Sequence, residues 1–353
     1  MQKTILVTGG LGFIGSHTVV ALQEAGYEVV IVDNLSNSFA FVLDGICSIS
    51  GVMPRFYEGD CNDRAFMQQL FDKEKIVGVI HFAAYKAVGE SVAYPLKYYH
   101  NNLLSLIVLL ELMQQYKVAH LVFSSSCTVY GQPEQLPVDE SAPILPAQSP
   151  YGNTKQVSEE IIRDSVQAGI PIKVLALRYF NPIGAHPSAH IGELPIGVPN
   201  NLVPYITQTA AGIRPELSIF GKDYNTPDGT CIRDFIHVMD LAEAHVKALD
   251  YLLRQDAPSL YDYVNIGTGK GHSVLEVVQT FERVNRIKLP YKFAPRRPGD
   301  VEQIYAKADK ACQLLGWKAS RSLDQALRDA WQWQVALKEK GILEKMQKAE
   351  TNS

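Results

Sequence analysis

The fold is decided by the stretch Thr4-Ile-Leu-Val-Thr-Gly-Gly-Leu-Gly-Phe-Ile-Gly15, near the start of the 353-residue chain. Residues 4–8 form an apolar run, which predicts a strand buried on both faces of a parallel sheet. A helix is predicted over residues 17–25 and a second strand over residues 28–32, which Asp33 closes. Strand, glycine loop, helix, strand and terminal acid in this order form the fingerprint of a dinucleotide-binding unit.

The same stretch predicts NAD rather than NADP. Gly9, Gly12 and Gly15 let the backbone approach a pyrophosphate, and the helix N-terminus supplies amide donors and the positive end of a dipole. The carboxylate of Asp33 suits both ribose hydroxyls of the adenosine half and would repel a 2′-phosphate.

Further strands are predicted at residues 55–58, 77–81, 121–123 and 172–178, and polar or small residues follow each of them. Ligands of open α/β sheets bind at the carboxyl edge of the strands, so these residues share one edge. The predicted fold class is therefore α/β, a Rossmann-like doubly wound parallel sheet with a smaller α/β substrate-binding domain.

Tyr151 and Lys155 lie four apart on a predicted helix and so share one face of it. A lysine ammonium beside a phenol lowers the tyrosine pKa from about 10 toward neutrality, which makes the tyrosine a general base. Ser126, at the end of a predicted strand, would share the substrate oxygen. Such a pair also occurs by chance in many helices, but beside a nucleotide loop it predicts hydride chemistry at a carbinol carbon.

Composition excludes several function classes. The net charge of −4 gives no electrostatic case for nucleic acid or an anionic membrane. The five cysteines are scattered, and neither they nor the histidines have metal-ligand spacing, so no disulfide framework and no metal site are predicted. A strand begins close to Met1 and the apolar stretch 103–113 is about half as long as a membrane span, which predicts a soluble cytoplasmic protein without a signal peptide.

Longer motifs add a family resemblance. Together with the glycine loop, Ser124-Ser-Ser-Cys-Thr-Val-Tyr-Gly131 and the Tyr151/Lys155 pair resemble an extended short-chain dehydrogenase/reductase. A further set of motifs resembles the UDP-glucose 4-epimerase (UDP-galactose 4-epimerase) family, and these motifs span residues 81–91, 178–188, 199–205, 228–234 and 296–300. The resemblance runs from residue 4 to about residue 335.

The resemblance implies a chemistry in which tightly held NAD is not consumed. Tyr151 would deprotonate the sugar 4-hydroxyl while C4 gives up a hydride, and the 4-keto sugar would turn and take the hydride back on its other face. Ser126 would hydrogen-bond the 4-oxygen, and Lys155 would bind the nicotinamide ribose. The implied activity is reversible interconversion of UDP-glucose and UDP-galactose.

The resemblance also implies the residues that contact each ligand. The NAD contacts would be Phe13, Ile14, Asp33, Asn34, Asn37, Asp60, Cys61, Phe82, Ala83, Lys86, Asn101, Tyr151, Lys155 and Phe180. The UDP-sugar contacts would be Lys86, Ser126, Tyr151, Asn181, Asn201, Leu202, Ser218, Phe220, Arg233, Arg297, Asp300 and Ile304. Arginines suit a diphosphate and an aspartate suits ribose hydroxyls. Local sequence alone would make Arg233 and Asp234 a surface ion pair.

Three departures from the family pattern stand out. Ile304 occupies a position where a large tyrosine goes with glucose and galactose only, which predicts that UDP-GlcNAc and UDP-GalNAc are accepted as well. Cys127 replaces a small residue beside Ser126 and is expected to be tolerated. The segment 39–43 is unusually apolar and has no predicted function.

The predicted domains are an NAD-binding domain over residues 1–181, a mostly UDP-sugar-binding domain over 182–341 and a frayed tail over 342–353. The strand at 263–266 is expected to return to the large sheet. Residues 103–112 predict a buried or interface helix. In the family it pairs with the Tyr151 helix across a homodimer interface, so a homodimer is predicted.

Two alternatives remain open. An NDP-sugar 4,6-dehydratase also oxidises C4, but it needs an Asp-Glu pair where this chain has Cys127-Thr128. An inactive NAD-sensing regulator on the same fold usually lacks the tyrosine or the lysine, and both are present here.

Overall fold

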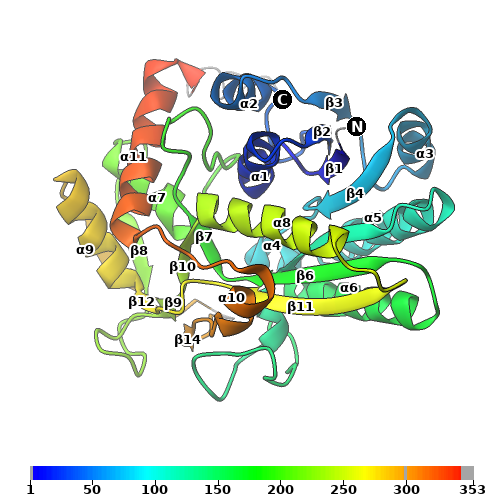
Figure 1. Ribbon diagram of the computed structural model, residues 1–353. Coiled ribbons are helices and arrows are strands. Elements are labelled where there is room, and N and C mark those ends of the chain that lie inside the picture. Colours follow the sequence, from blue (N-terminus) through cyan, green and yellow to red (C-terminus); the bar gives the residue numbers. More distant parts are fainter. Residues whose placement is uncertain (1–2, 298–299, 343–353) are drawn as a thin grey trace.

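A computed structural model describes residues 3–297 and 300–342, and a seven-stranded parallel sheet forms its centre (Figure 1). The strand order is β11-β6-β5-β4-β1-β2-β3. The strands are β1 (Thr4–Thr8), β2 (Glu28–Asp33), β3 (Arg55–Glu58), β4 (Ile76–His81), β5 (His120–Ser126), β6 (Lys173–Tyr179) and β11 (Leu260–Ile266). The prediction of a Rossmann-like parallel sheet is confirmed, since all six strand pairs are parallel.

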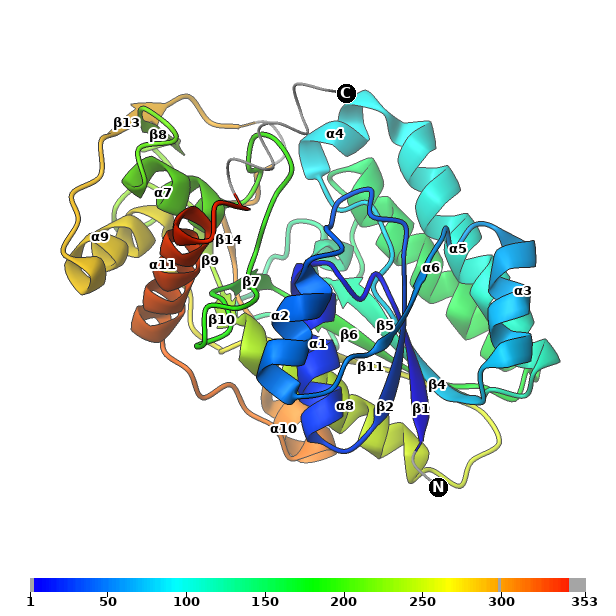
Figure 2. The ribbon, with the colours of Figure 1, turned by 90° about the horizontal axis from the view of Figure 1, so that it is seen from above.

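Helices cover both faces of this sheet (Figure 2). One face carries α1 (Phe13–Glu24), α2 (Val42–Ser50) and α8 (Val238–Leu253), and the other carries α3 (Arg64–Lys73), α5 (Pro95–Gln115) and α6 (Pro150–Gln167). Every residue of β1 is buried, and alternate side chains divide between two cores, Val7 with the α1 and α8 side and Leu6 with the α5 side. This double burial explains the unbroken apolar run.

Helix α1 begins at Phe13, four residues before the predicted start at residue 17. Gly12 is its N-cap, so the helix starts directly on the glycine loop. Helix α6 begins at a serine-proline step, where the Ser149 hydroxyl accepts from the Gly152 amide at 3.2 Å and Pro150 occupies the first turn. These two starts place both helix N-termini at the carboxyl edge of the sheet.

A smaller region beside the sheet has its own core, which contains Ile206, Phe281 and Leu327. Its helices are α7 (Leu202–Ala210), α9 (Val274–Asn285) and α11 (Leu323–Glu339). Its short strands are β7 (Asn181–Ile183), β8 (Leu217–Phe220), β9 (Ile232–Arg233), β10 (Phe235–His237), β12 (His272–Ser273), β13 (Tyr291–Ala294) and β14 (Gln303–Ile304). The remaining elements are α4 (Val88–Ala93), α10 (Asp309–Leu315) and a 3-10 turn at Cys127–Tyr130.

The chain returns to the large sheet after it has entered the smaller region. Strand β11 pairs in parallel with β6, and Val264 lies opposite Leu177. The expectation for residues 263–266 is thus confirmed, with a longer strand than predicted. The domain division at residue 181 stays a prediction. The tail was predicted over residues 342–353, and residues 343–353 lie outside the described part of the chain.

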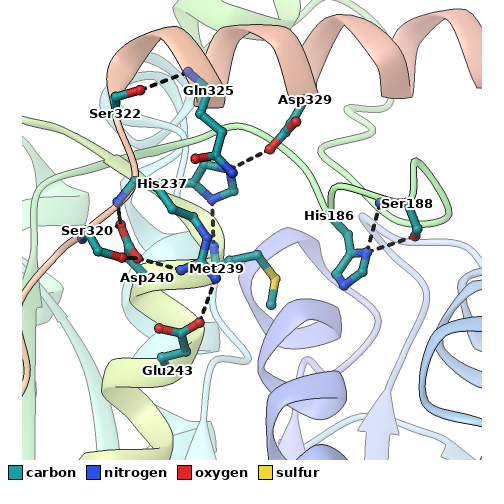
Figure 3. A network of polar contacts seen from close by, with 11 residues as sticks. His186, Ser188, His237, Met239, Asp240, Glu243, Ser320, Ser322, Gln325 and Asp329 are labelled. Atoms are coloured by element: carbon teal, nitrogen blue, oxygen red, sulfur yellow. Dashed lines mark hydrogen bonds and ion pairs between the residues drawn. The ribbon is translucent and has the colours of Figure 1, made fainter.

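A polar network joins α8 to α11 and to the segment that precedes it (Figure 3). The Nδ1 of His237 accepts from the Met239 amide at 3.0 Å, and its Nε2 lies 3.0 Å from the Asp329 carboxylate on α11. The fully buried Asp240 accepts from the Ser320 and Arg321 amides and pairs with the Arg321 guanidinium at 2.5 Å. The network therefore ties the large sheet's helix layer to the smaller region.

The apolar segment 39–43 has a structural explanation. Val42 is buried, and Phe41 and Leu43 pack against the same core as α1 and α8. Within the described ranges, no helix is both long and apolar enough to cross a membrane.

Candidate active site

At Gly9 and Gly15 of the glycine loop, neighbouring backbone atoms leave no room for a side chain. A Cβ on Gly15 would lie 2.2 Å from the Gly9 carbonyl oxygen, and one on Gly9 would lie 2.9 Å from the Ala83 nitrogen. At Gly12 the nearest atom would be 3.3 Å away, and no side chain of the described chain caps α1 there. An open helix N-terminus above a bare loop fits a pyrophosphate, so these residues fit NAD.

Asp33 binds the loops on either side of it. Its Oδ2 accepts from the Leu11 amide at 3.0 Å, and its Oδ1 accepts from the Leu35 amide at 3.0 Å and the Ser38 hydroxyl at 2.7 Å. A carboxylate has about four acceptor positions, so roughly one is left for a ligand. If Asp33 is to accept hydrogen bonds from two ribose hydroxyls, one of these three bonds must therefore break. Ser38 was missed by sequence reasoning because nothing in its pattern marks it.

Three of the predicted NAD contacts, Asn34, Asp60 and Asn101, are joined by hydrogen bonds that include one missed residue, Asn62. The Asp60 carboxylate accepts from the Asn62 side chain at 2.8 Å, and that amide also donates to Asn101 at 3.0 Å. Asn34 reaches the same Asp60 carboxylate at 3.5 Å. Cys61 is buried and Asn37 is exposed. The structure thus brings Asn34, Asp60 and Asn101 together.

Several other predicted NAD contacts surround the loop. Phe13 opens α1, with its ring 5.4 Å from that of His17, and Ile14 packs into the core below. Phe82 and Ala83 follow β4 directly, and the Ala83 amide lies 3.4 Å from the Thr8 hydroxyl. All of them stand at the carboxyl edge of β1 or β4.

The three predicted catalytic residues meet at the same edge. Ser126 ends β5, and Tyr151 and Lys155 lie one turn apart on α6. The Lys155 Nζ donates to the Ser124 carbonyl oxygen at 2.7 Å and lies 6.0 Å from the centre of the Tyr151 ring. Lys155 is buried, while Tyr151 is only partly exposed.

The prediction that Lys155 lowers the Tyr151 pKa is wrong for the protein groups alone. Burial raises the pKa of Tyr151 to about 12, and the Ser126 hydroxyl acts in the opposite direction. Burial also lowers the pKa of Lys155 to about 8, against the attraction of Glu159. At neutral pH the lysine is therefore charged and the tyrosine protonated, so a further positive charge is needed to form a phenolate.

The predicted substrate residues form two groups. In the first, Arg233 lies opposite Ile304 in the β9–β14 register, and Asp300 lies 3.9 Å from Arg233 and 2.8 Å from Arg297. The Arg297 guanidinium stands 5.7 Å from the ring centre of the exposed Phe220. Ser218 lies on the same strand, β8, and Asn181 opens β7.

The second group depends on Glu193, which sequence reasoning missed. Its Oε1 accepts from Lys86 at 3.3 Å and from Asn201 at 2.6 Å, and Leu202 begins α7 immediately after. The Glu193 carbonyl oxygen accepts from the Trp333 ring on α11 at 3.0 Å. Lys86 and Asn201, from distant parts of the chain, are thus held together by one carboxylate.

Cys127, Phe180 and Ile304 belong to one buried cluster beside the catalytic strand end. Burial raises the pKa of the Cys127 thiol to about 12, so it stays a neutral thiol. Asp234 is not on the surface as local sequence suggested, because it is fully buried and accepts from the Thr268, Gly269 and Ala306 amides. No group of three or more His, Cys, Asp or Glu in the described ranges could hold a metal ion.

Comparisons with known proteins agree with this arrangement. Residues 6–330 match the family model described as GDP-mannose 4,6 dehydratase. The chain is 53% identical over 330 residues to UDP-glucose 4-epimerase of Bacillus subtilis (strain 168), which covers 94% of this chain and 96% of that protein.

Two solved structures are similar over nearly their whole length. One is UDP-glucose 4-epimerase from Bifidobacterium longum in complex with NAD+ and UDP, at 45% identity and a TM-score of 0.91, covering 95% of this chain and 98% of the other. The second is UDP-glucose-4-epimerase from Stenotrophomonas maltophila with bound NAD and formylated UDP-arabinopyranose, at 48% identity and a TM-score of 0.92, covering 96% and 100%. The chain therefore belongs to the family of the GDP-mannose 4,6 dehydratase model and, by its full-length relatives, to the UDP-glucose 4-epimerase family of extended short-chain dehydrogenases/reductases.

Proposed function

We propose that this protein is an NAD-dependent UDP-hexose 4-epimerase that interconverts UDP-glucose and UDP-galactose through a transient 4-keto sugar. One observation carries the proposal: Ser126, Tyr151 and Lys155 meet at the sheet edge that also bears the glycine loop and Asp33. The relatives named UDP-glucose 4-epimerase, two of them solved with NAD, support it.

Each residue has a defined task in this chemistry. NAD held by the glycine loop and Asp33 would supply the acceptor and donor of the C4 hydride. Tyr151 takes the proton of the 4-hydroxyl and later returns it, and Ser126 hydrogen-bonds the 4-oxygen and orients it. Lys155 provides a buried positive charge one helix turn from Tyr151. Arg233 and Arg297 neutralise the diphosphate, and both stand beside Asp300.

The dehydratase alternative is less favoured. Elimination of water needs an acid and a base beside the sugar, and this chain offers the neutral thiol of Cys127 and the hydroxyl of Thr128. Neither side chain can serve as a carboxylic acid or carboxylate at neutral pH. The matching family model is described as a dehydratase, but this chain has Cys127 and Thr128 where a dehydratase needs an Asp-Glu pair.

We further propose that N-acetylated UDP-hexoses are substrates. Ile304 is buried against Cys127 and Phe180 and stands in register with Arg233. A branched aliphatic side chain leaves more room near the sugar 2-substituent than a tyrosine ring does. Purified protein without added NAD should therefore convert both UDP-galactose and UDP-GalNAc, read as product ratios by chromatography.

Ile304→Tyr is the matched variant for that assay. It should keep UDP-galactose turnover within about threefold and lower UDP-GalNAc turnover by at least about tenfold, since loss of steric fit costs about 1–3 kcal/mol. Conversion of UDP-galactose alone by the wild type would refute the pocket argument. Conversion of neither sugar would refute the epimerase proposal itself.

A homodimer in the cytoplasm is the proposed state. Several apolar side chains on α4 and α5 face solvent, among them Val92, Ile107 and Leu96, which is 81% exposed. Burial of such a surface favours association. Sedimentation equilibrium should give twice the chain mass, and Leu96→Lys should shift the protein toward monomer without changing its secondary structure. A wild-type monomer at micromolar concentration would exclude the dimer.

A further inference from the structure

A buried ion pair lies directly behind the catalytic strand end, on the sheet face that α6 covers. The Arg178 Nη2 and the Glu159 Oε2 are 2.5 Å apart, and the two side chains are only 3% and 9% exposed. The pair lies between β6 and α6, and the ring of Tyr263 on β11 stacks 3.8 Å from the guanidinium carbon. The proposed chemistry assigns neither residue a role.

The Glu159 carboxylate is fully engaged. It accepts from the Arg178 Nε at 2.9 Å, the Arg178 Nη2, the Ser125 hydroxyl at 2.5 Å and the Tyr261 hydroxyl at 3.1 Å. Four donors fill about all of its acceptor positions, which fixes the carboxylate in place. A buried pair of this kind is weak evidence for stability, because apolar residues of similar volume often serve as well.

The pair is linked to the catalytic centre through Ser125 and through the position of Glu159 on α6. Ser125 stands between Ser124, whose carbonyl oxygen accepts from Lys155, and Ser126. Alternate side chains of a strand point to opposite faces, so Ser125 points toward α6 while Ser124 and Ser126 point to the opposite face of the sheet. The hydrogen bond from Ser125 to Glu159 therefore holds the strand backbone that lies between these two neighbours. Glu159 also follows Lys155 by one turn of α6, so the two side chains share a helix face.

We propose that Glu159, held by Arg178, is a positioning residue of this active site: it fixes the Ser124–Ser126 strand end and supplies the negative charge that keeps the Lys155 ammonium charged. This inference rests on the proposed function, because only there does the charge of Lys155 serve a reaction.

The surroundings of Lys155 support this role. The ionisable groups that act on it are Glu159 and Tyr151 from α6 and His81 from β4. His81 carries no charge, because burial lowers its pKa to about 3. Burial lowers the pKa of Lys155 to about 8, and Glu159 is the group that raises it. Without that carboxylate, burial would favour the neutral amine unopposed.

Glu159→Gln is the first test. Its Lys155 should lose a proton at lower pH, so the basic limb of the kcat profile should move down by roughly one pH unit or more. At a pH near 8 this lowers kcat by up to about tenfold, while the KM for UDP-galactose stays within about twofold. Glu159→Asp, which keeps the charge, should retain the wild-type limb.

Glu159→Gln leaves a buried guanidinium without its partner, so a second variant secures the test. The Glu159→Gln/Arg178→Gln pair removes both charges and should fold, since no buried charge is left unpaired. It should still shift the limb, because Glu159 is the group that raises the Lys155 pKa. Asp240→Asn is the structural control, because it breaks another ion pair with a fully buried carboxylate, whose partner Arg321 is partly exposed. It should lower Tm and leave the limb unchanged.

A readout without turnover completes the experiment. In protein labelled with ¹³C at the lysine ε-carbons, the chemical shift of Lys155, assigned with Lys155→Met, should titrate at lower pH in the double variant. A folded double variant with the wild-type Lys155 titration and limb would overturn the inference. A wild type without UDP-galactose turnover would instead defeat the proposed function, and the titration would still decide whether Glu159 controls Lys155.

Discussion

Tyr151→Phe should abolish nearly all turnover of UDP-galactose while the protein folds normally and retains NAD. The substitution removes one hydroxyl, and loss of a general acid–base group costs about 10²–10⁴ in rate. The reason is positional, because α6 holds the Tyr151 hydroxyl one helix turn from the buried Lys155, and a water molecule would not be fixed in that place. Initial rates of UDP-glucose formation give the measurement.

The control for this variant is Tyr116→Phe, which removes a hydroxyl that donates to Asp72 on the surface. It should have wild-type kcat. NAD content by absorbance and Tm by calorimetry should agree among the three proteins. If Tyr151→Phe kept more than about a tenth of the wild-type rate, the role of Tyr151 as proton carrier would be wrong.

Gly15→Ala should give a protein that is destabilised and carries little NAD. Its Cβ would lie 2.2 Å from the Gly9 carbonyl oxygen and 2.9 Å from the Gly10 Cα, and both are backbone atoms that cannot rotate away. The loop must therefore shift, and overpacking of this kind costs about 1–3 kcal/mol of unfolding free energy. The shift also moves the amides at the N-terminus of α1. Tm and bound NAD per chain are the measurements.

Gly89→Ala provides the comparison, because a Cβ on this glycine of α4 has no described atom within 4 Å. It should retain wild-type Tm and NAD content. If Gly15→Ala had the same Tm and the same NAD content as Gly89→Ala, the glycine loop would not be tightly packed at Gly15.

Much of the large sheet was predictable because its strands are short apolar runs with a ligand-binding residue after each. Asp33 and Ser126 each end a strand, so their placement at one edge follows from parallel pairing. The start of α1 was misplaced because Phe13 and Ile14 read as part of the loop. The expectation of a lowered Tyr151 pKa was wrong for a different reason. Burial raises this pKa, and the spacing of two residues on a helix does not reveal how deeply they are buried.

Two of the missed residues, Glu193 and Glu159, act on side chains that are far away in sequence. Glu193 joins Lys86 to Asn201, more than a hundred residues from the former. Glu159 reaches Arg178 and Ser125 across three elements. No local motif marks such contacts, because they arise only when the sheet is assembled.

Strand β11 limits the positions at which two related epimerases can be joined into a working chimaera. The smaller region is not one continuous length of chain, since residues 260–266 complete the edge of the large sheet and bring Tyr261 and Tyr263 over Glu159 and Arg178. A chimaera joined at residue 181 would bring in a foreign edge strand together with the new sugar-binding residues. Its Arg178 would then stack on side chains that came from another parent. Recombination between relatives is therefore compatible with the catalytic centre only where the β6 and β11 partners are inherited together.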